Sequence, residues 1–163
     1  MNTVWRFQLL ALLVGASLLA GCASPARQST PAAAFWSGRM GLQIQSQPAQ
    51  NLSAAFELQG SAERGELLLL SPIGSTLAQL NWTPQSAELK QGERQWSSTR
   101  LDELTTLLTG TALPVPALFD WLAGKSTTPA GWRVDLSQLA QGRIQAERQS
   151  PAPQVLLKVV LER

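Results

Sequence analysis

Apolar and polar residues alternate along much of the first half of the chain, the pattern of strands that bury one face. Met40, Leu42 and Ile44 alternate with polar or small neighbours from residue 35 to 45, and Leu52 to Leu58 repeat the pattern after a turn at 47–51. Shorter apolar segments follow at 66–70, 77–82, 87–91 and 94–97, separated by turns that contain Gly, Pro or Ser. The spacing predicts at least six antiparallel strands joined by tight turns.

Four consecutive leucines, Leu67 to Leu70, make one of these segments apolar on both faces, so the pattern leaves open which of them face the core. The turn that follows places the bulky apolar Ile73 between Pro72 and Gly74. Turn tips usually face water. Ile73 therefore either packs back onto the domain or contacts an apolar partner outside it.

The apolar spacing changes to three and four residues between 99 and 124, which predicts two short helices. In the first helix Thr99 is the expected N-cap and Gly110 the expected end. Its leucines share one face: Leu101, Leu104, Leu107 and Leu108. Pro116 fits the first turn of the second helix, over 117–123, which ends at Gly124. Both helices are so apolar that they must cover another part of the protein.

Alternation returns in the last third of the chain, at 132–135, 143–148 and 155–162. The last of these segments places its apolar residues on one side: Val155, Leu157, Val159 and Leu161. We therefore expect eight to eleven short antiparallel strands with a helical insertion, a mainly β fold with a small α insertion.

The N-terminal segment is typical of an export signal, because Arg6 precedes an apolar run over 7–19. A run of about 13 residues is too short to span a bilayer, which takes roughly 20. Residues 19–22, Leu-Ala-Gly-Cys, resemble the bacterial lipobox, which implies that Cys22 receives a diacylglycerol and, after cleavage, an N-acyl chain. The alternative is an ordinary signal peptide that takes Cys22 with it, but Cys22 is the one cysteine of the chain, and an exported lone thiol would be an unpaired liability.

These features divide the chain into a lipoprotein signal peptide at 1–21, a lipidated flexible tether at 22–34 and a single domain at 35–163. In the lipoprotein class that the lipobox implies, Asp directly after the cysteine favours the inner membrane. That position is Ala23 here, so we expect anchoring at the periplasmic face of the outer membrane of a Gram-negative bacterium.

Composition excludes several classes of function. The net charge is +2 with no basic block, so a nucleic-acid partner is not expected. His is absent, which removes the commonest general base and metal ligand, and Tyr is absent too. No Gly-rich phosphate loop with a following Lys occurs, so no nucleotide is expected to drive the protein. We expect no catalytic residue, no metal site and no cofactor beyond the acyl groups on Cys22.

Three segments carry a family resemblance. Residues 67–80 (LLLLSPIGSTLAQL), 108–124 (LTGTALPVPALFDWLAG) and the strand around 36–39 (WSGR) are similar to the outer-membrane lipoprotein receptor LolB family. The resemblance implies a curved, incompletely closed antiparallel β-barrel with short helices forming a lid over an apolar cavity, similar to the periplasmic carrier LolA. This chain looks shorter than long family members in its C-terminal third, where the resemblance gives the least detail.

The resemblance also implies a function and residue roles. The protein would accept triacylated lipoproteins from LolA in the cavity and insert them into the outer membrane, working as a monomer. Ile73, with Pro72 and Gly74, would form the membrane-insertion loop. The residues expected to line the cavity and its lid are Met40, Leu42, Ile44, Leu52, Phe56, Leu58, Leu80, Trp82, Leu104, Leu107, Leu108, Leu118, Phe119 and Leu122.

Two other classes of function stay open. An outer-membrane scaffold or assembly subunit would share the lipobox and the strands but have a filled core and no lipid cargo. A wall hydrolase would need two cooperating carboxylates. Acidic residues are present, but the pattern places them on outward faces or at helix starts and pairs none of them: Glu57, Glu66, Asp102, Asp120 and Asp135.

Overall fold

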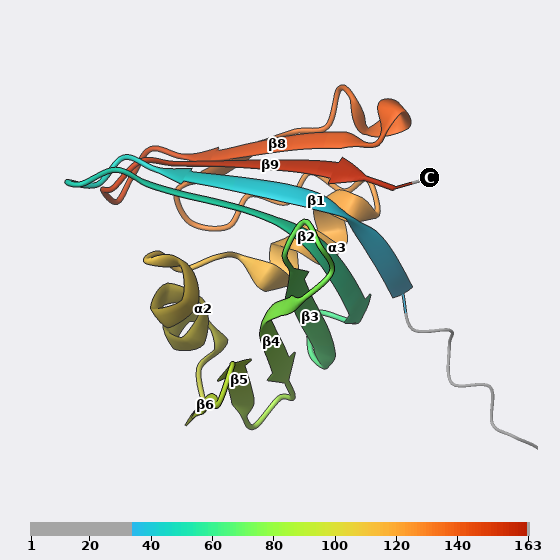
Figure 1. The fold of residues 1–163 in the computed structure, drawn as a ribbon. Coiled ribbons are helices and arrows are strands. Elements are labelled where there is room, and N and C mark those ends of the chain that lie inside the picture. The colour runs from blue at the N-terminus through green and yellow to red at the C-terminus, as the bar shows by residue number, and fades with distance from the viewer. Residues whose placement is uncertain (1–33, 163) are drawn as a thin grey trace, which may run out of the picture. The chain divides into compact units, whose positions relative to one another are not determined.

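Nine strands form one antiparallel sheet in the computed structural model, which describes residues 34–162 (Figure 1). The strands are β1 Ala34–Ile44, β2 Gln50–Gly60, β3 Gly65–Leu70, β4 Thr76–Trp82, β5 Ala87–Gln91, β6 Arg94–Ser98, β7 Trp132–Asp135, β8 Arg143–Arg148 and β9 Val155–Leu161. Their order is β6-β5-β4-β3-β2-β1-β9-β8-β7, so β6 and β7 are the two edges. The predicted mainly β fold, an incompletely closed barrel with a small helical insertion, is confirmed.

The pairing of β1 with β9 joins the first six strands to the last three. Gly38 lies opposite Leu161 in this ladder, and a Cβ at residue 38 would collide with the backbone carbonyl of Val160. A glycine is therefore required at this position of β1. On its other side β1 pairs with β2 over the full length of both strands, from Ala34 opposite Gly60 to Ile44 opposite Gln50.

The hairpin of β3 and β4 settles the orientation of the four leucines. Leu67 and Leu69 are buried, whereas Leu68 and Leu70 lie half-buried on the other face. The register shifts between Leu69 and Leu70, so Leu77 is an extra residue in β4 and is 38% exposed. A β-bulge of this kind breaks strict alternation.

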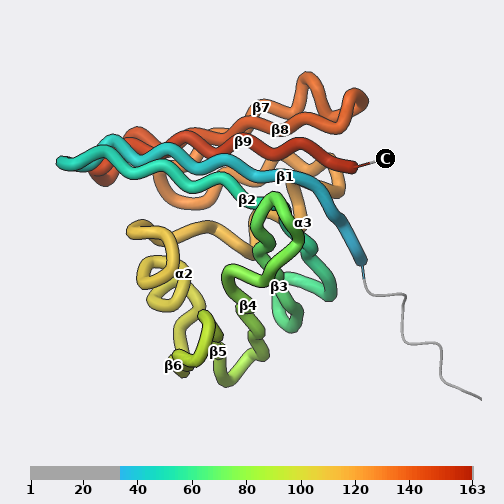
Figure 2. Tube along the Cα trace, viewed as in Figure 1, coloured from blue at the N-terminus to red at the C-terminus, as the bar shows by residue number. Residues whose placement is uncertain are grey.

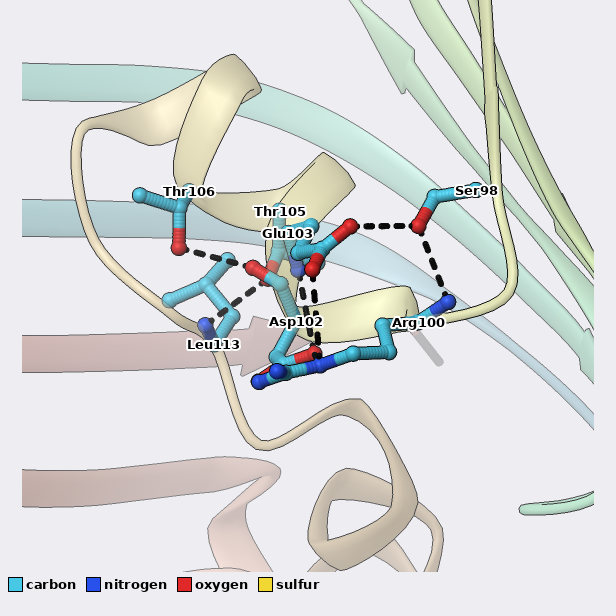
Figure 3. A network of polar contacts seen from close by, with 7 residues as sticks. All are labelled: Ser98, Arg100, Asp102, Glu103, Thr105, Thr106 and Leu113. Atoms are coloured by element: carbon cyan, nitrogen blue, oxygen red, sulfur yellow. Dashed lines mark hydrogen bonds and ion pairs between the residues drawn. The ribbon is translucent and has the colours of Figure 1, made fainter.

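Helix α2, Leu101–Thr109, begins differently from the prediction. Arg100 is the N-cap and makes no capping bond with its side chain, so Thr99 is not the cap. The Ser98 hydroxyl instead accepts a hydrogen bond from the Arg100 N–H at 3.0 Å and donates one to Glu103 at 2.6 Å (Figure 3). The end at Gly110 is confirmed, because this residue has a left-handed φ of 80° and donates to the Thr106 carbonyl.

Helix α3, Val115–Leu122, starts two residues before the predicted 117, with Pro116 in its first turn as expected. A short 3₁₀ turn, Leu139–Gln141, was not predicted. Figure 2 shows β3–β6 turned away from the direction of β8 and β9, with α2 and α3 on the inner side of this bend. Neither helix, nor any other helix of the described residues, is long and apolar enough to cross a membrane.

The hydrophobic core lies between the concave side of the sheet and the two helices. It takes side chains from eight of the strands and, from α3, Val115, Ala117, Leu118, Phe119, Trp121 and Leu122. The described residues 34–162 belong to one compact unit that contains the sheet and this core. Because the unit buries its apolar surface within itself, we expect it to fold without the segment before it.

Candidate functional site

The inner face of the sheet gathers almost all the side chains that were expected to line a cavity. Eleven of them are buried in one cluster: Met40, Leu42, Ile44, Phe56, Leu58, Leu80, Trp82, Leu104, Leu118, Phe119 and Leu122. Leu52 and Leu108 are partly buried against the same cluster. Leu107 is the exception, because its side chain is 54% exposed and does not share the buried face of α2.

Sequence reasoning missed part of this lining. Leu67, Leu69 and Leu89 face inward from the meander, and Trp121 is fully buried in α3. From the last three strands come Trp132, Ile144, Val155, Leu157 and Val159. Alternation in 143–148 and 155–162 could have placed the β8 and β9 residues here, since the two strands pair with each other and β9 with β1.

Helix α3 closes the interior. The Phe119 ring lies edge-on to Trp36 of β1 at 5.6 Å and to Trp82 of β4 at 6.0 Å, and Trp121 lies 6.1 Å from Trp132 of β7. Leu58, Leu80 and Val115 have no exposed surface at all. An acyl chain could therefore enter this interior only if α3 or its neighbours moved aside.

The buried polar side chains of the described residues are four, and they form one network at the α2–α3 link: Thr105, Thr109, Thr111 and Arg148. The single hydroxyl proton of Thr109 is shared between the Thr105 carbonyl at 2.9 Å and the Thr111 carbonyl at 2.8 Å. Thr105 Oγ1 accepts from the Leu113 N–H at 3.1 Å (Figure 3). Arg148 Nη2 donates to Thr111 Oγ1 at 2.7 Å. The network ties the link between the helices to the end of β8.

Nothing in the sequence analysis singled out this network. Arg148 does share the inward parity of Ile144 and Ala146, which was the available signal. Burial lowers the pKa of its guanidinium. Its side chain also stacks over the Trp132 ring, with 5.8 Å between the guanidinium carbon and the ring centroid.

Four of the five acidic residues considered for a hydrolase bind amides or cations in this structure. Glu66 accepts from Gln59 and Gln79, and Asp120 lies 3.9 Å from Lys125. The Asp102 carboxylate binds Arg100 at 2.6 Å, and this hydrogen bond lowers its pKa (Figure 3). Asp135 accepts from the Ser137 N–H, which lowers the pKa of Asp135. These contacts have the character of solvated surface pairs.

The turn between β3 and β4 holds Ile73 away from the domain. The Ser71 N–H donates to the Ser75 carbonyl at 2.8 Å, the Gly74 N–H donates to the Ser71 carbonyl at 2.9 Å, and Gly74 has a φ of 84°. Within this hydrogen-bonded turn Ile73 is 89% exposed, and Pro72 and Gly74 are exposed beside it. The Ile73 side chain therefore does not pack back onto the domain, which was one of the two alternatives for its role.

Cys22, the signal segment and the tether up to residue 33 lie outside the described residues. Ala34, which was predicted to end the tether, is instead the first residue of β1 and pairs with Gly60. The domain itself matches the family model described as "Outer membrane lipoprotein LolB" over residues 35–154. The chain belongs to the LolB family. This confirms the resemblance carried by the segments at 36–39, 67–80 and 108–124.

Several relatives named outer-membrane lipoprotein LolB support the assignment. The chain is 32% identical to the one from Cupriavidus metallidurans over 155 residues, which cover 89% of this chain and 75% of the relative. It is 32% identical to that of Bordetella petrii over 150 residues, 87% of this chain and 74% of the relative. The LolB of Chromobacterium violaceum is 30% identical over 138 residues, 80% of this chain and 73% of the relative. The chain thus spans about three quarters of the length of each of these relatives.

Proposed function

We propose that this protein is an outer-membrane receptor that takes acylated lipoproteins from a periplasmic carrier of the LolA type and inserts them into the outer membrane. Membership of the LolB family gives the general role, lipoprotein localisation at the outer membrane. The observation that supports cargo binding is the apolar interior of the open sheet. The short helix α3 covers this interior and buries most of its side chains there.

The chemistry of this role is transfer without bond breaking. Each methylene group withdrawn from water contributes about 0.8 kcal/mol, so three exposed acyl chains would cost tens of kcal/mol. A receptor must replace one apolar environment with another. In this domain acyl chains would take the positions of Leu118, Phe119 and Leu122 against the sheet, an exchange of apolar for apolar contacts that needs no nucleotide.

The covering helix is suited to this exchange. The backbone hydrogen bonds of α3 are local, for example from Leu118 N–H to the Pro114 carbonyl and from Ala123 N–H to the Phe119 carbonyl. The nine-stranded ladder does not include it. Moving α3 therefore costs side-chain packing but no sheet hydrogen bonds, and incoming acyl chains restore the packing.

The exposed loop supplies the contact with the membrane. An Ile side chain gains about 1.5–3 kcal/mol when it leaves water for an apolar phase. Because Ile73 is 89% exposed and held by a hydrogen-bonded turn, nearly all of this free energy is available to dock the loop on lipid. We propose that it directs cargo from the interior into the bilayer.

The anchor is proposed to be Cys22, carrying a diacylglycerol and an N-acyl chain, with no other cofactor. One acyl chain binds a membrane only marginally and stable anchoring takes two such signals, so three chains would hold the receptor permanently. This anchoring leaves the domain at the membrane that receives the cargo.

The test uses the domain from residue 23 onward, mixed with a LolA-type carrier loaded with a triacylated lipoprotein. We expect the cargo to co-purify with the domain without nucleotide, and then to move into vesicles when these are added. If the cargo stays on the carrier although the domain is folded, the protein is a scaffold or assembly subunit and not a lipoprotein receptor.

Ile73→Glu separates the two steps. Cargo uptake should remain and delivery to vesicles should fall, since the change removes an apolar contact outside the core. Val160→Glu is the matched control, because Val160 is also an exposed apolar residue but lies on the outer face of β9 between Arg39 and Arg143 of the neighbouring strands. Equal delivery by both variants would refute the role of the loop.

A further inference from the structure

A pocket of about 540 Å³ lies beside the α2–α3 link, where the segment before β7 and the end of β8 meet it. Its walls are mostly apolar, and Leu101, Leu113, Pro114, Pro129 and Trp132 contribute to them. The volume falls within the roughly 300–1,000 Å³ of small-molecule sites. Two charged residues also line it, Asp102 and Arg148.

Arg148 is incompletely paired in this pocket. Its side chain is 8% exposed, yet its partners are neutral oxygens, Thr111 Oγ1 at 2.7 Å and the Pro153 carbonyl at 3.3 Å, both bound by Nη2. Nε is buried and has no hydrogen-bond partner among residues 34–162. Within the same residues no carboxylate lies within ion-pair distance of this guanidinium. Buried charges are normally paired, so this arrangement is costly.

Asp102 does not compensate this charge. Arg100 holds its carboxylate with two bonds, from Nη2 at 2.6 Å and from Nε at 3.2 Å (Figure 3). Arg100 also pairs with Glu103 at 3.6 Å, and all three of these charged side chains are exposed to solvent. The pocket therefore combines apolar walls with one positive charge that has no counterion.

We propose that this pocket binds a fatty acid, with its carboxylate paired to Arg148 and the first part of its chain against the apolar walls. Nε and Nη2 form one edge of the guanidinium, the geometry that binds a carboxylate through two parallel hydrogen bonds. Such a ligand supplies the missing acceptor for Nε and the missing negative charge together. The proposal goes beyond the receptor function, because the ligand is a free single-chain lipid and not an acylated protein.

Binding must loosen the α2–α3 link. Nε is buried, and Nη2 is held by Thr111 of the link, so a carboxylate reaches this edge only by displacing Thr111. The two substitutions Arg148→Met and Thr111→Val should therefore act in opposite directions. The first removes the charge, while the second frees the guanidinium and keeps the shape of the side chain.

The experiment uses the domain from residue 23 onward, labelled with ¹⁵N and ¹³C. It is titrated with dodecanoate below the critical micelle concentration, or with dodecan-1-ol below its solubility limit. Calorimetry gives each Kd, and the Arg148 Nε–H resonance reports contact at the site. We expect dodecanoate to shift this resonance and to bind at least about tenfold more tightly than the alcohol, as a charge-assisted hydrogen bond allows. Thr111→Val should tighten dodecanoate binding, and Arg148→Met should weaken it at least about tenfold.

Arg133→Met is the matched control, because Arg133 is exposed on the neighbouring strand β7. This substitution should leave the Kd for dodecanoate unchanged. Equal affinities for dodecanoate and the alcohol, or unchanged binding in Arg148→Met, would overturn the proposal. Resonance shifts confined to the methyl groups of Leu42 and Leu157 would do the same, since they would place the chain in the interior. If Arg148→Met does not fold, the Arg148 resonance and Thr111→Val decide the question.

Discussion

Replacing Phe119 by Ala tests whether α3 is the element that yields to acyl chains. The Phe119 side chain is buried at 8% exposure, and a buried Phe→Ala change costs about 3–5 kcal/mol. Its two edge-on contacts, with Trp36 and Trp82, contribute about 0.5–1.5 kcal/mol each beyond burial, or roughly 1–3 kcal/mol together. Both contacts exist only while α3 covers the sheet.

The substitution should therefore have two measurable effects. Urea unfolding should show a loss of about 3–5 kcal/mol in the free energy of unfolding at an unchanged slope. Binding of an apolar fluorescent dye should become tighter by about 5- to 150-fold, because the lost ring contacts of roughly 1–3 kcal/mol no longer oppose opening.

A control must separate opening from general instability. In Gly38→Ala the nearest atoms to the new Cβ belong to Val160 and Leu161 of β9 and not to α3. This variant should therefore not increase dye affinity when it is compared at the same loss of stability. If Phe119→Ala loses less than about 1 kcal/mol, Phe119 is not packed as the structure shows. If it loses the expected stability but binds no more dye than Gly38→Ala, access to the interior does not depend on α3.

Three further predictions concern single residues. Gly38→Ala itself should lower the urea midpoint strongly, because the new Cβ meets the Val160 carbonyl; a midpoint equal to that of the unmodified domain would contradict this. Since Arg100 lowers the pKa of Asp102, that pair stabilises α2 above the ordinary carboxyl pKa of about 3.9 and stops doing so as the pH falls through the lowered value. Asp102→Asn should therefore flatten the pH dependence of Tm below pH 5, and an unchanged profile would argue against it. Cys22→Ser should abolish acylation and outer-membrane retention, as mass spectrometry and membrane fractionation would show; acylation elsewhere would refute the anchor.

Alternation predicted the sheet well because burial of one face is a local property of each strand. The segments expected at 87–91, 132–135 and 143–148 coincide with β5, β7 and β8. The inward positions of β1, β2 and β4 followed from the same alternation. Where both faces were apolar, in Leu67 to Leu70, only the pairing with β2 and β4 decided the orientation.

The errors have separate physical causes. Thr99 was a sound N-cap by residue type, but the Ser98 hydroxyl bonds the Arg100 N–H and Glu103, and Arg100 is the residue at the helix start. Leu107 fits the helical spacing yet is exposed, because α2 buries Leu104 and, in part, Leu101 and Leu108. The Arg148 network depends on Thr111, 37 residues away in sequence, which no local pattern reveals.

The helical insertion is attached to the sheet in two places, by polar contacts at the α2–α3 link and by apolar contacts of α3. This difference determines which part should move first when the domain opens. The α2–α3 link is held to β8 by the Arg148–Thr111 hydrogen bond, whereas α3 is held to the sheet by rings and aliphatic side chains. Acyl chains can replace the apolar contacts of α3 but offer nothing to Arg148. The structure therefore favours an opening in which α3 yields first, between the Pro114 link and Gly124, while the link stays in place. An acceptor that competes for Arg148, such as a carboxylate, would release the second attachment and widen the opening.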